Sequence, residues 1–236
     1  MRPFVKICGI TRLEDAEHAI ARGADALGFV FWPGSPRAIA PDRARAIAAA
    51  VPSTVIVGVF VNQTIEEVSR IAQAVQLDAI QLHGNEGAEY AAQLKRPVLK
   101  AIGAGAAAGQ TAGAWPGRVL LLLDAVDPER HGGTGRTVDW PSAAVLARHR
   151  PVMLAGGLRP GNVAEAIQTV QPFGIDVSSG VESCPGKKDP ARLKALFEAI
   201  DAAITTNSAS GSEVSDEGRA WLTAVRRRVG REAREI

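Results

Sequence analysis

Short apolar runs alternate with longer amphipathic stretches along most of the chain. The runs have the length of a β-strand and are almost continuously apolar, which is typical of strands covered on both faces of a parallel sheet. Eight of them are predicted, at residues 4–8, 25–31, 54–61, 78–83, 97–102, 118–124, 151–155 and 174–179. Helical patterns fall between or after them, at residues 13–22, 42–50, 64–76, 86–95, 140–149, 160–171 and 189–204. The connection at 103–117 predicts only a short or irregular helix.

Eight strand–helix units within residues 1–204 favour one closed domain, a (β/α)8 TIM barrel of the α/β class, over an open doubly wound sheet. Thr64 and Asp139 stand where helix N-caps are expected. In such a barrel the chemistry lies at the C-terminal ends of the strands. Polar residues at those ends are therefore the candidates for function.

The last residues, 205–236, differ from the rest. A polar linker rich in Ser and Gly precedes a stretch in which Trp221, Leu222, Val225 and Val229 have helical spacing. We expect a helical extension docked on the outside of the barrel. A dimer contact, an acidic partner for the six arginines that begin at Arg219, and a lid over the barrel mouth are the alternatives.

Composition narrows the class of protein. With 46% hydrophobic but only 5% aromatic residues, the core must be filled by Ala, Val, Ile and Leu, and a net charge of +2 does not point to nucleic acid or an anionic membrane. Cys8 and Cys184 form no disulfide framework and no metal-ligand spacing. The cysteine spacing therefore leads us to expect no metal. No basic-then-apolar leader or membrane-spanning run is visible, so we expect a cytoplasmic protein.

Two of the predicted buried strands end in a polar residue. Side chains alternate along a strand, so Lys6 and Cys8 face away from Val5 and Ile7 and point together into the barrel. Another strand, at residues 118–124, runs straight into Asp124. Cys8 and Asp124 are therefore a candidate acid–base pair.

Further polar residues interrupt the strands. Gln81 and His83 share one face of the fourth strand, Asp176 and Ser178 share one face of the eighth, and Lys100 lies in the fifth. Asn62 lies at the end of the third strand. Buried polar groups need partners, so a ring of them predicts a ligand, water or mutual hydrogen bonds. Taken alone, His83 would more often be an ordinary interior histidine.

Glycine-rich loops follow the seventh and eighth strands. Gly156 and Gly157 come after one, and Ser178, Ser179 and Gly180 after the other. Barrels commonly bind phosphate there, so these residues predict a phosphorylated ligand. A third loop, Gly132-Gly133-Thr134-Gly135, predicts a mobile cover or a plain surface loop.

One arginine is a candidate for binding a carboxylate. Two prolines in Phe31-Trp32-Pro33-Gly34-Ser35-Pro36-Arg37 would hold Arg37 at the rim of the barrel mouth. Its planar donor fork suits a carboxylate, and an ordinary solvated loop arginine is the alternative.

Together these segments resemble one family, phosphoribosylanthranilate isomerase of tryptophan biosynthesis. The resemblance covers about residues 1–200 and rests on KICGIT (6–11), GFVFWPGSPR (28–37), VGVFVN (57–62), IQLHG (80–84), LLLDA (121–125), GGTG (132–135), AGGL (155–158), DVSSGVE (176–182) and PGKKD (185–189). It implies a (β/α)8 barrel that converts N-(5-phosphoribosyl)anthranilate into 1-(2-carboxyphenylamino)-1-deoxyribulose 5-phosphate by an Amadori rearrangement. Cys184 and the tail after about residue 204 lie outside the family pattern.

The resemblance also implies residue roles. Cys8 would be the general base, Asp124 the general acid and Arg37 the group that holds the anthranilate carboxylate. The AGGL and SSG loops would bind the phosphate. Apart from the resemblance, we expect Gln81 and His83, which share one face of the fourth strand, to bind the substrate. No cofactor is implied, since the substrate nitrogen serves as electron sink. These roles require a protonated Asp124 and a Cys8 that is at least partly thiolate.

Two other functions remain open at this point. An aldolase-like lyase acting on a phosphorylated substrate would need a Schiff-base lysine or a pair of carboxylates. Lys100 is the only predicted strand lysine besides Lys6, and Cys8, Asp124 and Arg37 would then be unexplained. A non-catalytic phosphate-binding module would keep the glycine loops but leave Cys8 and Asp124 unexplained. Either a monomer or a homodimer is compatible with the sequence.

Overall fold

A computed structural model describes residues 2–105, 108–125, 138–206 and 216–232 of the chain. Helical residues beyond Val225 are described by their backbone only. The predicted cover at residues 132–135 lies outside the described residues.

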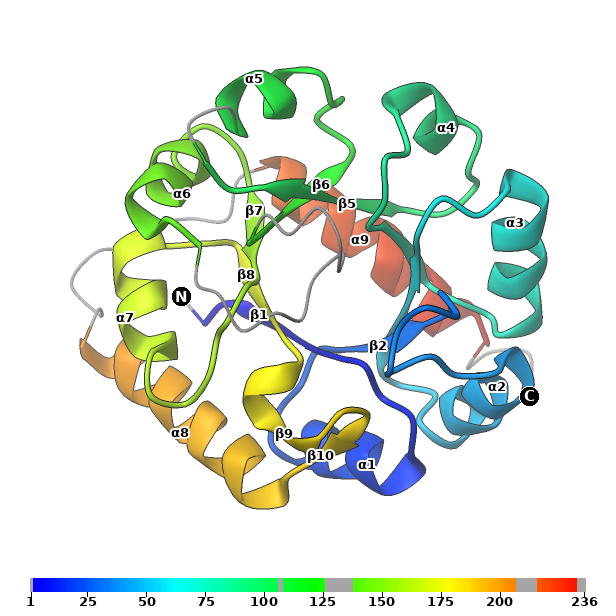
Figure 1. Ribbon diagram of the computed structural model, residues 1–236, viewed down its shortest axis with the longest axis horizontal. Coiled ribbons are helices and arrows are strands. Elements are labelled where there is room, and N and C mark those ends of the chain that lie inside the picture. The colour runs from blue at the N-terminus through cyan, green and yellow to red at the C-terminus, as the bar shows by residue number, and fades with distance from the viewer. Residues whose placement is uncertain (1, 106–107, 126–137, 207–215, 233–236) are drawn as a thin grey trace.

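Eight parallel strands close into a barrel in chain order, with β8 hydrogen-bonded back to β1 (Figure 1). This confirms the predicted (β/α)8 fold and all eight predicted strands. They are β1 (Phe4–Cys8), β2 (Ala26–Val30), β3 (Val55–Phe60), β4 (Ala79–Leu82), β5 (Val98–Gly103), β6 (Leu120–Asp124), β7 (Val152–Leu154) and β8 (Gly174–Val177).

Helices surround the barrel, as Figure 1 shows. They are α1 (Leu13–Ala21), α2 (Pro41–Ala50), α3 (Ile65–Ala74), α4 (Ala88–Ala92), α5 (Ala108–Gly113), α6 (Trp140–Ala147), α7 (Val163–Val170) and α8 (Pro190–Thr206). Thr64 caps α3, because its hydroxyl accepts the N–H of Glu67 at 3.3 Å. Asp139 does not cap α6 in this way; its carboxylate accepts the Ser142 hydroxyl instead.

Helix α4 is much shorter than the predicted 86–95. Glu86 is drawn out of the helix because its carboxylate accepts the backbone N–H of Asn62 at 2.7 Å and pairs with Lys100. At the other end Pro97 directly precedes β5, and the residue before a proline disfavours helix. The irregular connection predicted at 103–117 forms the six-residue helix α5.

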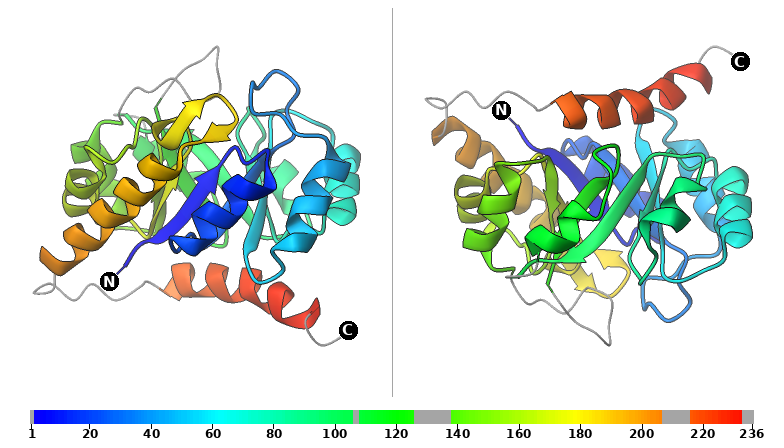
Figure 2. Two further views of the ribbon diagram at one scale, coloured as in Figure 1. Left: turned by 90° about the horizontal axis from the view of Figure 1, so that it is seen from below. Right: turned by 90° about the horizontal axis from the view of Figure 1, so that it is seen from above.

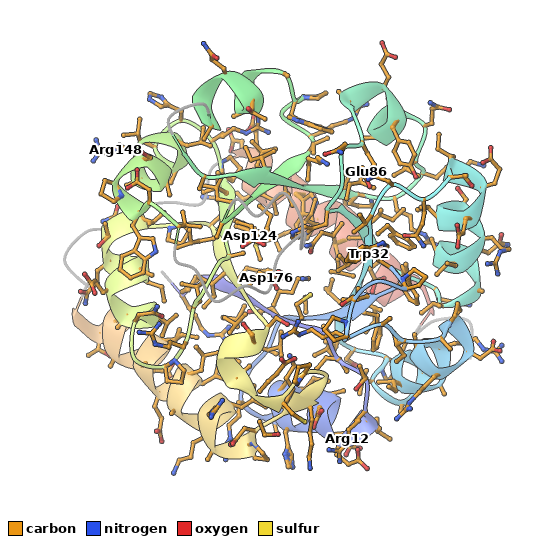
Figure 3. All side chains as sticks on the ribbon, viewed as in Figure 1. Arg12, Trp32, Glu86, Asp124, Arg148 and Asp176 are labelled. Atoms are coloured by element: carbon orange, nitrogen blue, oxygen red, sulfur yellow. The ribbon has the colours of Figure 1, made fainter. Side chains whose placement is uncertain are left out.

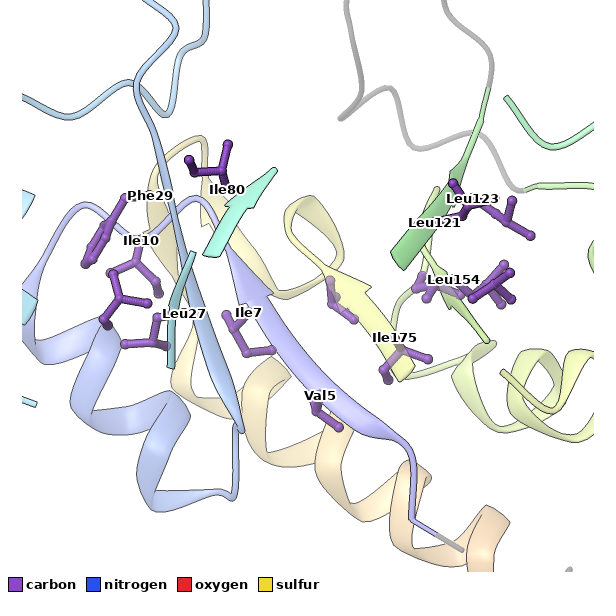
Figure 4. Packing of buried hydrophobic residues seen from close by; sticks show 14 of the residues in the cluster. Val5, Ile7, Ile10, Leu27, Phe29, Ile80, Leu121, Leu123, Leu154 and Ile175 are labelled. Carbon is purple, nitrogen blue, oxygen red and sulfur yellow. The ribbon is translucent and has the colours of Figure 1, made fainter. Parts of the chain in front are cut away.

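The alternation predicted for β1 and β8 is confirmed. Val5, Ile7 and Ile175 lie in the large apolar core between the strands and the helices, which Figure 4 shows from close by. Phe4 packs instead with the apolar residues inside the barrel, and Cys8 packs with Val30 and Val59 nearer its mouth. Each strand therefore has one face for the helices and one for the barrel interior.

A small hairpin after β8 was not foreseen in the sequence. A single 3-10 turn, η1 (Ser179–Val181), leads into β9 (Glu182–Cys184) and β10 (Lys187–Lys188), which pair antiparallel. Gly186 at the turn has φ +79, a conformation that glycine adopts without strain. The PGKKD segment therefore forms a folded element at the barrel mouth.

The C-terminal helix α9 (Asp216–Glu232) crosses the N-terminal end of the barrel, on the side away from β9 and β10 (Figure 2). Trp221 is 4% exposed and packs edge-on against Phe4, with ring centroids 5.9 Å apart, and against Phe173 at 6.4 Å. The predicted docked helix is confirmed. The lid alternative is wrong, because the described part of α9 lies at the opposite end from the mouth.

Candidate active site

A cavity of about 440 Å³ opens among the C-terminal ends of the strands. Its lining includes residues from β1, β4, β6 and β8 and from the loops that follow β2, β7 and β8. Figure 3 shows Asp124 and Asp176 near the barrel axis. Most of the sequence-predicted site residues line this one cavity: Cys8, Arg37, Gln81, His83, Asp124, Gly156, Gly157, Ser178 and Ser179.

Cys8 is the last residue of β1, and its register partner on the neighbouring strand β2 is Gly28. A Cβ atom at Gly28 would lie 2.8 Å from the Cys8 sulfur and 3.0 Å from Lys6 Nζ, so glycine provides the space for both groups. Burial raises the pKa of Cys8, more than the neighbouring Lys6 ammonium lowers it. The free protein therefore favours the thiol, whereas the proposed chemistry needs some thiolate.

Lys6 lies on the same face of β1 as Cys8 and is completely buried. Its Nζ donates to Asp176 Oδ1 at 2.8 Å, across the β1–β8 pairing in which the two residues are register partners. Burial acts to lower the pKa of Lys6, but the attraction of Asp176 and Cys8 outweighs burial and raises it. Lys6 is thus held as an ammonium ion.

Asp124 ends β6 and is held from two sides. Its Oδ1 accepts the N–H of Ala125 at 2.8 Å, and its Oδ2 lies 3.2 Å from His83 Nε2. Gln81 Nε2 in turn lies 2.9 Å from His83 Nδ1. Gln81 and His83, expected to bind substrate, therefore also form a chain of contacts that ends on the candidate acid.

The orientation of the Gln81 amide decides where the proton lies in this chain. With Nε2 donating to His83 Nδ1, the ring carries its proton on Nε2 and donates to an Asp124 carboxylate. The reversed amide would accept from Nδ1–H, and His83 Nε2 would then accept from a protonated Asp124. In the first arrangement the buried Gln81 Oε1 has no partner among the described residues.

Arg37 is not a free loop arginine. Its Nε and Nη2 donate to the two carboxylate oxygens of Glu182, at 3.0 Å to Oε1 and 2.7 Å to Oε2. Within the part of the chain that the structure describes, Nη1 has no hydrogen-bond partner. The guanidinium is therefore fixed by Glu182 along one edge and keeps a donor for a ligand at the cavity.

Lys188 of β10 secures this arrangement. Its side chain is fully buried, and Nζ donates to Glu182 Oε1 at 2.8 Å, to the Cys8 carbonyl at 2.6 Å and to the Ser178 carbonyl at 3.2 Å. Burial acts to raise the pKa of Glu182, but Arg37 and Lys188 outweigh burial and lower it. The sequence analysis missed Glu182 and Lys188 as site residues; their only signal was the charge within the SSGVE and PGKKD segments.

The loops after β7 and β8 lie against each other. Gly156 and Gly157 have φ +78 and +63, and a side chain at Gly156 would approach Ala125 N to 2.9 Å. Gly180 does not line the cavity; a side chain there would overlap the carbonyl oxygen of Leu158. The buried Ser178 hydroxyl has no partner among the described residues, so it is available to a ligand.

Lys100 and Asn62 were expected in the ring of polar groups, and that expectation is wrong. Lys100 shares its face of β5 with Val98 and Ile102 and points outward, where Nζ pairs with Glu86 at 2.9 Å. Asn62 accepts the N–H of Asn85 on the same outer side. Both residues hold loops together and do not line the cavity.

Among the described residues, no group of three or more His, Cys, Asp or Glu is arranged to hold a metal ion. No helix in the described ranges is both long and apolar enough to cross a membrane.

Comparison with known proteins identifies relatives over most of the chain. The family described as N-(5'phosphoribosyl)anthranilate (PRA) isomerase matches residues 5–199. The N-(5'-phosphoribosyl)anthranilate isomerase of Desulforudis audaxviator is 49% identical over 202 residues, covering 83% of this chain and 96% of the relative. That of Geotalea uraniireducens is 47% identical over 195 residues, covering 82% and 96%. Helix α9 lies beyond the matched residues.

A solved structure has the same architecture. The phosphoribosyl anthranilate isomerase of Thermotoga maritima superposes with a TM-score of 0.79 at 42% identity, covering 86% of this chain and all of that one. The active-site cavity and the relatives agree with the resemblance seen in the sequence. The chain belongs to the N-(5'-phosphoribosyl)anthranilate isomerase family.

Proposed function

We propose that this chain isomerises N-(5'-phosphoribosyl)anthranilate with Cys8 as general base and Asp124 as general acid. The observation that carries the assignment is that the thiol of β1 and the carboxyl of β6 line one cavity, together with Arg37. An isomerisation through an opened sugar needs one proton donor and one proton acceptor. Strands on different sides of a barrel provide groups on different sides of a bound sugar.

The acid acts first. Asp124 gives its proton to the ring oxygen of the ribose, the bond between that oxygen and C1 breaks, and the nitrogen lone pair forms a C1=N double bond. The Ala125 N–H then stabilises the carboxylate that remains, and so does His83 in the arrangement in which its ring carries the proton on Nε2. Gln81 holds the His83 ring in place for this step.

The base acts second. The Cys8 thiolate takes the proton from C2, an S–H bond forms, and the C2–H electron pair makes a C1=C2 double bond while the nitrogen receives the pair from C1=N. Protonation at C1 and loss of the hydroxyl proton at C2 then give the ketone. Overall, hydrogen moves from C2 to C1 without any external oxidant or reductant.

The two ends of the substrate have matching partners. A phosphate fits the backbone N–H groups of the loops after β7 and β8 and the Ser178 hydroxyl, which has no partner among the described residues. The anthranilate carboxylate fits Nη1 of Arg37, which pairs with no other residue in the described ranges. A related structure, with a TM-score of 0.76 and 40% identity, holds reduced 1-(o-carboxyphenylamino)-1-deoxyribulose 5-phosphate, which carries both of these anionic groups.

A Schiff-base lyase is disfavoured by the lysines. Lys100 points away from the cavity toward Glu86. Lys6 is buried beneath the cavity as an ammonium paired with Asp176, and an amine must be neutral to attack a carbonyl. One solved relative is described as monomers generated from the dimeric isomerase of Thermotoga maritima. For this chain we propose either a monomer or a homodimer, with no nucleic-acid partner.

Replacing the base tests the proposal. We expect Cys8→Ser to lower turnover by roughly 10²–10⁴-fold with KM little changed, since proton transfer is a transition-state role. Turnover is followed as the loss of anthranilate-type fluorescence from enzymatically generated substrate. Cys184→Ser, which removes the exposed thiol, is the matched control and should remain fully active. Turnover of Cys8→Ser within about tenfold of wild type would contradict the assignment.

A further inference from the structure

A pair of opposite charges is buried directly beneath the candidate base. Lys6 is 0% and Asp176 9% exposed, and they face each other at 2.8 Å across β1 and β8. Lys6 shares the inward face of β1 with Cys8. The ammonium and the thiol both border the space above Gly28.

Stability alone does not account for this pair. Burying two charges has a large desolvation cost, and well-packed apolar residues of similar size often stabilise a core equally well or better. The interior layer below the pair is apolar, with Phe4, Val57, Leu99, Leu122 and Met153 among its members. The charges are thus confined to the layer that touches Cys8.

We propose that Lys6 and Asp176 are positioning residues for the base, with Lys6 providing the positive charge that the Cys8 thiolate needs and Asp176 holding that charge in place. The inference rests on the proposed role of Cys8. It assigns a function to the two charged residues of the barrel interior that the acid, the base and the substrate contacts leave unused.

Counting charges gives the direction of each effect. With Lys6 as ammonium and Asp176 as carboxylate, the buried group is neutral while Cys8 is a thiol and becomes −1 when the thiolate forms. Without Lys6 the same step goes from −1 to −2, which burial strongly disfavours. Without Asp176 it goes from +1 to neutral, which burial favours. The two losses therefore act in opposite directions on the same thiol.

A second cation lies near Cys8. Lys188 of β10 donates to the Cys8 carbonyl and shares the single carboxylate of Glu182 with Arg37. It also acts to lower the pKa of Cys8, but less than Lys6 does. Gln81 of β4 is uncharged, and His83 contacts Asp124. From β2 and β3 the neighbours of Cys8 are Val30 and Val59. Lys6 is thus the cation on the same strand face as the thiol, two residues before it.

The direct test measures thiolate formation in the free protein. In a Cys184→Ser background, the rate of Cys8 alkylation by iodoacetamide is recorded against pH, so that substrate binding plays no part. At neutral pH we expect Lys6→Gln to slow alkylation by about tenfold or more and Asp176→Asn to accelerate it. The pH limb of kcat/KM that reports the base should move in the same two directions.

Lys100→Gln is the matched control, because it removes another buried lysine of an ion pair, on the outer face of the barrel. It should leave the alkylation profile of Cys8 unchanged. Folding is checked by circular dichroism, and Asp176→Asn decides the question if Lys6→Gln does not fold. Equal directions for the two variants, or no change in Asp176→Asn, would overturn the proposal. Loss of the base role itself would appear separately, as high activity in Cys8→Ser.

Discussion

The two ends of the barrel are built from the same strands but have opposite character. At the N-terminal end, Phe4 and Phe173 stack with centroids 6.1 Å apart beneath Trp221 of α9. At the C-terminal end, the same interior face of the strands carries a thiol, carboxyls, an imidazole and an amide around a cavity. Figure 2 shows α9 at one end and the β9–β10 hairpin at the other.

The change of character occurs within single strands. Along the inward face of β1 the residues are Phe4, Lys6 and Cys8, and along that of β6 they are Leu120, Leu122 and Asp124. Apolar burial stabilises by roughly 25 cal/mol per Å². Buried polar groups lower stability unless they are partnered. The N-terminal half of the interior thus contributes stability, whereas the C-terminal half contributes the groups that proton transfer needs.

The substitution with the largest expected effect impairs catalysis and leaves the apolar end of the barrel intact. Asp124→Asn keeps the shape of the side chain but cannot deliver a proton, so we expect turnover to fall by roughly 10²–10⁴-fold. Because the substitution leaves the apolar end untouched, the melting temperature should change little. Steady-state kinetics and thermal unfolding measure both. Near-normal turnover would move the acid elsewhere, with His83 as the next candidate.

The second largest effect concerns stability, at the apolar end of the barrel. Trp221→Ala removes a ring that is 4% exposed, and we expect it to lower the free energy of unfolding by about 3 kcal/mol. A chain ending after Thr206 should likewise lose stability. Turnover per folded molecule should stay at the wild-type level in both, since α9 packs at the far end from the cavity.

Urea unfolding and kinetics of the same samples test this separation. Ala224→Gln, at an exposed position of α9, is the control and should leave stability nearly unchanged. A folded but inactive truncated chain would show that α9 belongs to the active site after all.

The third effect concerns ligand binding at the catalytic end. Arg37→Ala should weaken binding of a product analogue by roughly 1.5–3 kcal/mol, because it removes a charge-assisted contact. Glu182→Gln should weaken it less, since the guanidinium loses an anionic partner but keeps its charge. Titration calorimetry with an analogue that lacks the anthranilate carboxylate is the control. If both analogues lose equal affinity, Arg37 does not hold the carboxylate.

The smallest effect depends on pH. Burial acts to raise the pKa values of Glu86 and Glu182, but their cationic partners outweigh it and lower both. A lowered folded pKa stabilises the fold above the ordinary glutamate value and loses that contribution as the pH falls through the folded pKa. Both residues lie at or near the catalytic end, so acid should loosen that end first.

Urea unfolding at neutral pH and at about pH 3 measures this contribution. In Glu86→Gln the difference between the two pH values should be smaller than in wild type. An unchanged difference would show that the Glu86–Lys100 pair does not contribute to acid sensitivity.

The sequence alone predicted the closed barrel, the faces of β1, β4 and β8, and the position of Asp124 at the end of β6. Alternation with period 2 fixes which residues point inward once a strand is buried on both sides. That rule worked for β1, β4 and β8. It could not place Lys100, because a lysine on an outward face looks the same in sequence as one on an inward face until its partner Glu86 is known.

Only the tertiary structure decided which charges meet. Arg37 and Glu182 are 145 residues apart, and Lys6 and Asp176 are 170 apart, so no local pattern couples them. Closure of the barrel makes β1 and β8 neighbours, and that closure alone brings the ammonium, the carboxylate and the thiol into one buried group. The apolar stripe of α9 likewise predicted a docked helix but not its place. Phe4 and Phe173 come together at the N-terminal end only when the strands have assembled. Burying their rings against Trp221 removes apolar surface from water and favours docking of α9 at that end.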